Sequence, residues 1–229
     1  MCSAMVSELP LATQVGQLYM VGVSTQGLDQ ATHDAILDGE VGSAVLLGNT
    51  DAGADAIRGL TDELDELDLQ VPLAIAVDQE GGSVQRLRGE GFSEIPSAVD
   101  QAKLAEGELE LAARHWADEL ADAGVHWNLA PVADVVPVEK QSTNQPIGRL
   151  DRNYGNDLSG ISRAVAEYVD GMRIAGIATS LKHFPGLGHV VENTDFDAAT
   201  DDGWTILEAD AVTADTIPDT LTTSEEPQS

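Results

Sequence analysis

One group of polar residues lies in the segment 77–86, with the sequence VDQEGGSVQR, which begins at the last residue of the apolar run 72–77. A carboxylate such as Asp78 can accept two hydrogen bonds from adjacent hydroxyl groups, and the paired glycines after it let the backbone turn sharply. Arg86 adds a planar guanidinium that suits an oxygen-rich ligand. Taken alone, this segment is better interpreted as an Asp-capped turn with a surface arginine.

A second polar group, KHFPGLG at 182–188, follows the apolar run 176–181. Lys182 is a charged hydrogen-bond donor, and His183 can donate or accept near neutral pH. The Pro-Gly pair inside this segment favours a rigid turn. A histidine beside a lysine is usually structural, but two polar groups at two strand ends favour a shared binding site.

Two further segments lie between them, NLAPVADV at 128–135 and PIGRLDRNYG at 146–155. Asp134 could orient neighbouring donors or simply cap a loop, and both interpretations stay open. Arg152 is a candidate for a third ligand contact, with Arg149 as its nearest competitor. For both arginines the alternative is a solvated position on the surface.

The elements that must position these residues alternate between apolar β-rich runs and helical periodicity. Strands are expected at 18–23, 43–47, 72–77, 125–129 and 176–181. Helices are expected at 27–37, from a capping segment at 49–51 to about 67, at 106–123 and at 158–175. Continuous apolar strands separated by amphipathic helices predict a parallel α/β sheet covered by helices.

Two folds fit this alternation, an open doubly wound sheet and a (β/α)₈ barrel of the TIM type. A dinucleotide fold would have G-x-G-x-x-G after the first strand, but Ser24-Thr25-Gln26-Gly27 stands there. We therefore favour the barrel, which is incomplete at about five βα units because a whole one has about 250 residues. We predict a partial barrel over 1–197 and an acidic, disordered or loosely packed tail over 198–229.

The chain is strongly acidic, with a formal charge of −29 and only three lysines, Lys103, Lys140 and Lys182. A field of this sign repels nucleic acid and anionic lipid, so neither is an expected partner. It also suits a high-salt cytoplasm, which makes a halophilic source a hypothesis that folding against KCl concentration would test. Cys2 is the only cysteine, so no intrachain disulfide can form. Because neither a transmembrane run nor a signal-peptide pattern is visible, a cytoplasmic location is expected.

No cofactor or metal is expected either. His183, His189, Asp195 and Asp197 are close in sequence, but their spacing fits no common zinc pattern. The pattern of a P-loop or a nucleophile elbow is likewise missing. The sequence makes no prediction of the oligomeric state.

Four motifs occur in order: D-Q-E-G-G-x-V-Q-R, N-x-A-P-V-x-D-V, I-G-x-x-x-R-x-Y-G and K-H-F-P-G-x-G. Together they resemble the barrel motifs of family 3 glycoside hydrolases of the β-N-acetylhexosaminidase type, over about 11–195. The resemblance implies a glycosidase that releases terminal β-linked N-acetylglucosamine from peptidoglycan-derived or chitin-like saccharides. It also implies a retaining mechanism through a covalent glycosyl-enzyme intermediate.

The resemblance assigns roles to matching positions. The residues that would hold the terminal sugar are Asp78, Arg86, Arg152, Lys182 and His183. Many relatives carry an Asp-x-His acid/base pair after K-H-F-P-G-x-G, where this chain has Asn193-Thr194-Asp195. Asp195 is therefore the predicted acid/base, with His189 as the second candidate and a loop cap as the alternative.

The family's nucleophile is an aspartate in a later apolar segment ending in S-D, and we find no such segment after position 197. We assign no nucleophile. Two alternatives to an active enzyme follow: a catalytically inactive sugar-binding remnant, and a truncated product without a stable fold. An open barrel would leave strand edges unpaired, which is the reason for the second alternative.

Overall fold

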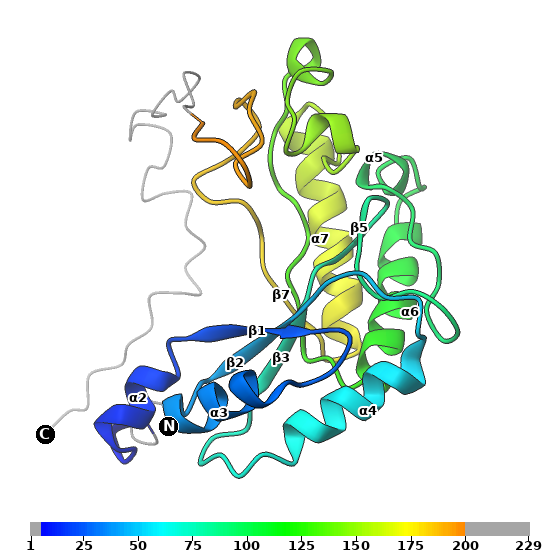
Figure 1. Cartoon of the computed structure of the whole chain (residues 1–229). Coiled ribbons are helices and arrows are strands. Elements are labelled where there is room, and N and C mark those ends of the chain that lie inside the picture. The colour runs from blue at the N-terminus through cyan, green and yellow to red at the C-terminus, as the bar shows by residue number, and fades with distance from the viewer. Residues whose placement is uncertain (1–5, 200–229) are drawn as a thin grey trace, which may run out of the picture.

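The structure, a computed structural model, describes residues 6–199 of the 229-residue chain (Figure 1). Its main feature is a parallel sheet with the strand order β1-β2-β3-β6-β7. The strands are β1 (Met20–Ser24), β2 (Ser43–Leu47), β3 (Ala74–Val77), β6 (Trp127–Asn128) and β7 (Ala178–Thr179). The predicted α/β class with a parallel sheet is confirmed.

The order of the strands in space follows their order in the chain. A doubly wound sheet would reverse this order at a switch point, whereas a barrel adds each strand beside the previous one. Register is continuous across the first three strands, with Ala44 opposite Val21 on one side and Ile75 on the other. The described residues therefore form part of a (β/α)₈ barrel that is not closed.

Helices connect the parallel strands, as predicted. They are α3 (Gln30–Gly39), α4 (Ala54–Asp65), α6 (Glu108–Asp122) and α7 (Leu158–Ile174), and α2 (Leu11–Gly16) precedes β1. Two of them begin at an aspartate whose side chain accepts a backbone N–H of the first turn. Asp29 accepts from Thr32 and Asp157 accepts from Gly160, which satisfies donors that the helix leaves free.

The prediction that residues 49–51 cap the second crossover helix is wrong. Helix α4 begins at Ala54, with Gly53 as N-cap and no capping side chain. The reason lies in Thr50, whose backbone pairs elsewhere: its N–H donates to the carbonyl of Arg86 and its carbonyl accepts from the N–H of Arg88, both at 2.9 Å. This segment thus joins the strand end to the next loop and is not available to the helix.

A short antiparallel hairpin follows β3 and was missing from the sequence prediction. Its strands are β4 (Gln79–Gly81) and β5 (Val84–Gln85). The expected sharp turn is confirmed, since Gly81 and Gly82 have φ values of 101° and 54°, which favour glycine. A Cβ at Gly81 would lie 2.3 Å from the carbonyl oxygen of Pro96. The loops also contain α5 (Ala98–Gln101), η1 (Val138–Lys140) and η2 (Gly148–Leu150).

The core lies between the sheet and its helices, and two of these helices, α6 and α7, pack side by side (Figure 1). Their backbones approach closely at Gly171, where a Cβ would lie 2.4 Å from the carbonyl oxygen of Glu110. Residues that fill this core include Leu46, Ile75, Leu120, Tyr168 and Met172. Close packing of this kind holds the strand ends in fixed positions.

Within residues 6–199, no helix is both long enough and apolar enough to cross a membrane. The predicted acidic tail, residues 198–229, lies outside the described residues except for positions 198 and 199. The boundary at 197 between barrel and tail stays a prediction.

Candidate functional site

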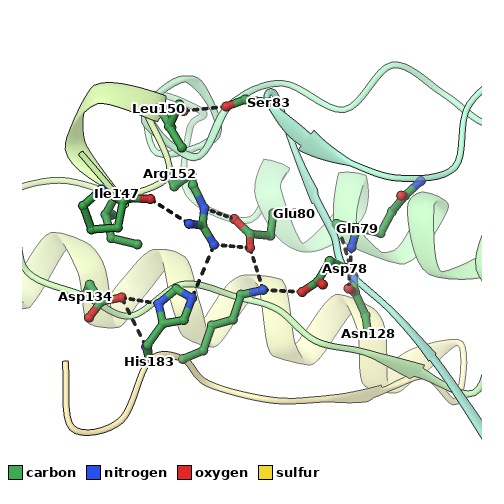
Figure 2. A network of polar contacts seen from close by, with 12 residues as sticks. Asp78, Gln79, Glu80, Ser83, Asn128, Asp134, Ile147, Leu150, Arg152 and His183 are labelled. Atoms are coloured by element: carbon green, nitrogen blue, oxygen red, sulfur yellow. Dashed lines mark hydrogen bonds and ion pairs between the residues drawn. The ribbon is translucent and has the colours of Figure 1, made fainter. Parts of the chain in front are cut away.

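Polar side chains from separate βα loops meet at the carboxyl ends of β3, β6 and β7 (Figure 2). Asp78 follows β3, Asp134 follows β6, and Lys182 and His183 follow β7. Arg152 arrives from the long segment between β6 and α7. Because the carboxyl ends of parallel strands share one edge of the sheet, residues far apart in sequence become neighbours there.

Lys182 lies between two carboxylates. Its Nζ is 2.6 Å from Oδ1 of Asp78 and 2.6 Å from Oε1 of Glu80. The side chain of Glu80 is only 6% exposed, against 23% for Asp78. Asp78 is therefore the carboxylate of this pair that a ligand could reach.

Arg152 binds Glu80 through a two-pronged ion pair. Its Nε donates to Oε2 at 2.8 Å and its Nη2 to Oε1 at 2.7 Å, while Nη1 donates to the carbonyl of Pro146 at 2.7 Å. The two parallel hydrogen bonds fix the plane of the guanidinium. A lysine at the same position could not make such a two-pronged pair.

Glu80 is held as an anion despite its burial. Burial acts to raise the pKa of Glu80, but the hydrogen bonds from Arg152 and the charges of Lys182 and Arg152 outweigh it. The pKa therefore lies below its ordinary value of 4.5. Conversely, burial acts to lower the pKa of Arg152, whereas the hydrogen bond and charge of Glu80 raise it above its ordinary value.

His183 is oriented by Asp134. Nδ1 of His183 lies 2.7 Å from Oδ2 of Asp134, which also accepts the backbone N–H of His183 at 3.2 Å. The other ring nitrogen, Nε2, lies 3.3 Å from Nη2 of Arg152. Because an arginine can only donate, Nε2 is the acceptor and the proton of the neutral ring belongs on Nδ1.

The two interpretations of Asp134 that the sequence left open both hold. Besides orienting His183, its Oδ1 accepts the N–H of Leu187 at 2.7 Å. Asp134 thus anchors both ends of the turn that follows Lys182. We call Asp78, Glu80, Asp134, Arg152, Lys182 and His183 the charged network.

A second, uncharged set of buried side chains adjoins the charged network. We call this set the amide network; its members are Gln79, Gln85, Gln101, Asn128, Tyr154 and Tyr168. Asn128 accepts the N–H of Gln79 at 3.0 Å and donates to the carbonyl of Gln79 and to the hydroxyl of Tyr168. These bonds tie the hairpin that carries Glu80 to β6 and α7.

A third set of hydrogen bonds, made by the side chain of Asn144, joins the loop that carries Arg152 to the loop that carries His183. Asn144 is fully buried; its Nδ2 donates to the carbonyls of Leu187 and Val190, and its Oδ1 accepts the N–H groups of Ile147 and Gly148. One side chain thus connects the loop of Arg152 to the loop of His183.

Four of the five predicted sugar-binding residues meet in the charged network, namely Asp78, Arg152, Lys182 and His183. The fifth, Arg86, donates from Nη1 to Oδ1 of Asn49 at 3.0 Å and takes no part in the network's hydrogen bonds and ion pairs within residues 6–199. Its contact with a sugar stays a prediction. Arg149, the competitor of Arg152, is exposed.

The predicted acid/base residues lie further along the same loop. Asp195 is exposed, and its backbone N–H donates to Oδ1 of Asn193 at 3.0 Å. His189 accepts a hydrogen bond from Lys140 through its backbone carbonyl, at 2.8 Å. The role of Asp195 stays a prediction.

Sequence reasoning missed Glu80 as a site residue, although it lies inside the D-Q-E-G-G motif. The available signal was a carboxylate two positions after Asp78, on the same side of an extended chain. The described part of the chain contains no group of three or more His, Cys, Asp and Glu side chains that could hold a metal ion. As a whole, the site presents carboxylate acceptors and cationic donors, which suits a ligand rich in hydroxyl groups.

Known proteins with the same architecture decide the family. The sequence model of the family described as "Glycosyl hydrolase family 3 N terminal domain" matches residues 10–211 of this chain. The chain belongs to glycosyl hydrolase family 3. The resemblance inferred from the four motifs is confirmed.

Individual relatives carry related names. A beta-hexosaminidase of Xylella fastidiosa (strain M23) is 37% identical over 191 residues, which cover 80% of this chain and 54% of the relative. A solved β-N-acetylhexosaminidase from Beutenbergia cavernae is 45% identical with a TM-score of 0.83, covering 86% of this chain and 61% of that one. A family 3 β-N-acetylglucosaminidase from a Paenibacillus species is 30% identical with a TM-score of 0.69, covering 81% and 35%. The chain thus spans about half the length of the curated relatives it matches.

Proposed function

We propose that this protein hydrolyses O-glycosidic bonds and releases terminal β-linked N-acetylglucosamine from peptidoglycan-derived or chitin-like saccharides, with retention of configuration. The names of the hexosaminidase relatives support the reaction. In this proposal the described residues supply the pocket for the terminal sugar.

The observation that carries the proposal is that four of the residues predicted to bind the sugar lie together in the charged network. Asp78 would accept hydrogen bonds from two adjacent hydroxyls, and Lys182 and Arg152 would donate to sugar oxygens. Nε2 of His183, a residue held by Asp134 at 2.7 Å, would exchange its bond from Arg152 for one from a sugar hydroxyl. Arg86 would add a donor from the neighbouring loop.

The retaining reaction needs two carboxyl groups in different roles. A nucleophilic carboxylate attacks the anomeric carbon while an acid protonates the departing oxygen; water then releases the sugar with the same residue acting as base. We propose Asp195 as the acid/base, in the loop that follows the Lys182 motif. No residue of this chain is proposed as nucleophile.

Two measurements on the 229-residue chain test the proposal. Calorimetry with N-acetylglucosamine measures binding, and release of p-nitrophenol from its N-acetyl-β-glucosaminide measures hydrolysis. Binding with hydrolysis supports the enzyme, and binding without hydrolysis supports the inactive sugar-binding remnant. Absence of both in a chain that melts cooperatively by circular dichroism would contradict the proposal.

The remaining proposals concern partners and location. With a formal charge of −29, the protein is expected to bind neutral saccharides and to avoid nucleic acid and anionic membranes. The cytoplasmic location expected from the sequence remains a proposal, which cell fractionation with an antibody would test.

A further inference from the structure

We propose that Glu80 is a positioning residue that arranges Arg152 and Lys182 as sugar donors and keeps Arg152 away from Asp78, whose second carboxylate oxygen can then accept from the sugar. The inference rests on the proposed function, because it concerns the same sugar pocket. Glu80 itself would touch no substrate.

Three contacts and near-complete burial keep Glu80 from binding a ligand itself. Oε1 receives Lys182 at 2.6 Å and Nη2 of Arg152 at 2.7 Å, while Oε2 receives Nε of Arg152 at 2.8 Å. Its side chain is almost fully buried. Glu80 thus binds both cations, and after their other contacts one N–H of Arg152 and one of Lys182 remain for a ligand.

The charges explain why Asp78 needs Glu80. Lys182 contacts both carboxylates at 2.6 Å, and Arg152 is also close enough to Asp78 for electrostatic attraction. Without the negative charge of Glu80, Asp78 would become the nearest anion for both cations. Lys182 already contacts Oδ1 of Asp78, and Arg152 would then compete with the hydroxyls of the sugar for Oδ2.

The backbone of Glu80 is held rigidly enough for this role. Nε2 of Gln101 donates to the carbonyl of Glu80 at 2.9 Å, and the hydroxyl of Tyr154 donates to Oε1 of Gln101 at 2.8 Å. Gln101 and Tyr154 are both buried. The amide network therefore fixes the position from which Glu80 acts.

The test compares Glu80→Gln, which keeps the shape and removes the charge, with Glu80→Asp, which keeps the charge but is one methylene shorter. Glu63→Gln, an exposed position on α4, is the control for a change of one charge. Calorimetry with N-acetylglucosamine should give a Kd about tenfold or more higher for Glu80→Gln, a smaller increase for Glu80→Asp and none for Glu63→Gln. Affinity of folded Glu80→Gln equal to that of the wild type would overturn the inference.

A second measurement separates positioning from general stabilisation. In the wild-type chain, the Nε–H signal of Arg152 in nuclear magnetic resonance should be protected from solvent exchange, because it is bonded to Glu80. Glu80→Gln should remove that protection while backbone amides of α6 and α7 keep theirs. Unchanged protection would also overturn the inference.

The two measurements keep the failures distinct. If the wild-type chain binds no sugar, the proposed function fails, and the Arg152 signal alone decides whether Glu80 arranges the cations. If Glu80→Gln does not fold, Glu80→Asp takes its place in both measurements: weaker binding with loss of Arg152 protection supports the inference, and unchanged values contradict it.

Discussion

Gln79 and Glu80 are neighbours on β4 but belong to different polar networks. Gln79 belongs to the amide network, in which each side-chain nitrogen and oxygen has a partner in the protein, as in its exchange of two hydrogen bonds with Leu87. Glu80 belongs to the charged network, whose cations and outer carboxylate remain partly exposed. The first network is buried and bonded to the protein and supports the fold; the second is partly exposed and retains hydrogen-bonding capacity for a ligand.

The difference teaches how a binding site can be both charged and ordered. Buried charges are costly unless they are paired and hydrogen-bonded. Here neutral side chains of the amide network bond to the backbone of the hairpin that carries Glu80. Among residues 6–199, no buried side-chain nitrogen or oxygen lacks a hydrogen-bond partner. Substitutions in the charged network should therefore change binding, and substitutions in the amide network should change stability.

The largest effect is expected for Asp78→Ala. Loss of two charge-assisted hydrogen bonds should weaken binding of N-acetylglucosamine by on the order of a hundredfold. The melting temperature should change little, because Lys182 keeps its contact with Glu80. Calorimetry and circular dichroism measure the two quantities, and unchanged affinity would remove Asp78 from the pocket.

Asn128→Ala should lower the stability of the fold, in contrast to Asp78→Ala, which should weaken sugar binding. The buried N–H of Gln79 and the hydroxyl of Tyr168 each lose a partner, so the free energy of unfolding should fall by about 1–3 kcal/mol. Urea denaturation measures the change, and Gln145→Ala, at an exposed amide side chain on the loop between β6 and α7, is the control. A stable variant with weakened sugar binding would break the distinction between the networks.

Tyr168→Phe is a milder change in the same network. The hydroxyl donates to the carbonyl of Gln79, which keeps its bond from Asn128, so in Tyr168→Phe only one N–H of Asn128 loses its acceptor. A loss of about 1 kcal/mol in unfolding free energy is expected, again by urea denaturation. A loss as large as that of Asn128→Ala would mean that Tyr168 contributes more than its hydrogen bonds.

The smallest effect should be a gradual dependence on pH. Because the folded-state pKa of Glu80 is below 4.5, its contribution to stability is complete above that value. It is lost as the pH falls through the lower folded-state pKa. Thermal melts of the wild type should show this decline, and Glu80→Gln should flatten it; parallel curves for both proteins would contradict the assignment.

Much of the fold could be predicted because it depends on local periodicity. Apolar runs near 43–47 and 72–77 became β2 and β3, and the long crossover helices were placed to within about two residues. The strands β6 and β7 are shorter than predicted, with two residues each. The hairpin β4–β5 was missed because its short strands have no periodic signal of their own.

The sequence by itself determined the residue types of the site, the order of the βα units and the family. It did so because motifs such as D-Q-E-G-G and K-H-F-P-G-L-G are contiguous, and each directly follows an apolar strand. Only the tertiary structure decided which charges pair: Glu80 with Arg152 and Lys182, His183 with Asp134, and Arg86 with Asn49 instead of the network. Pairing across 72 or 49 residues of chain depends on where the strands end in space, which no local pattern encodes.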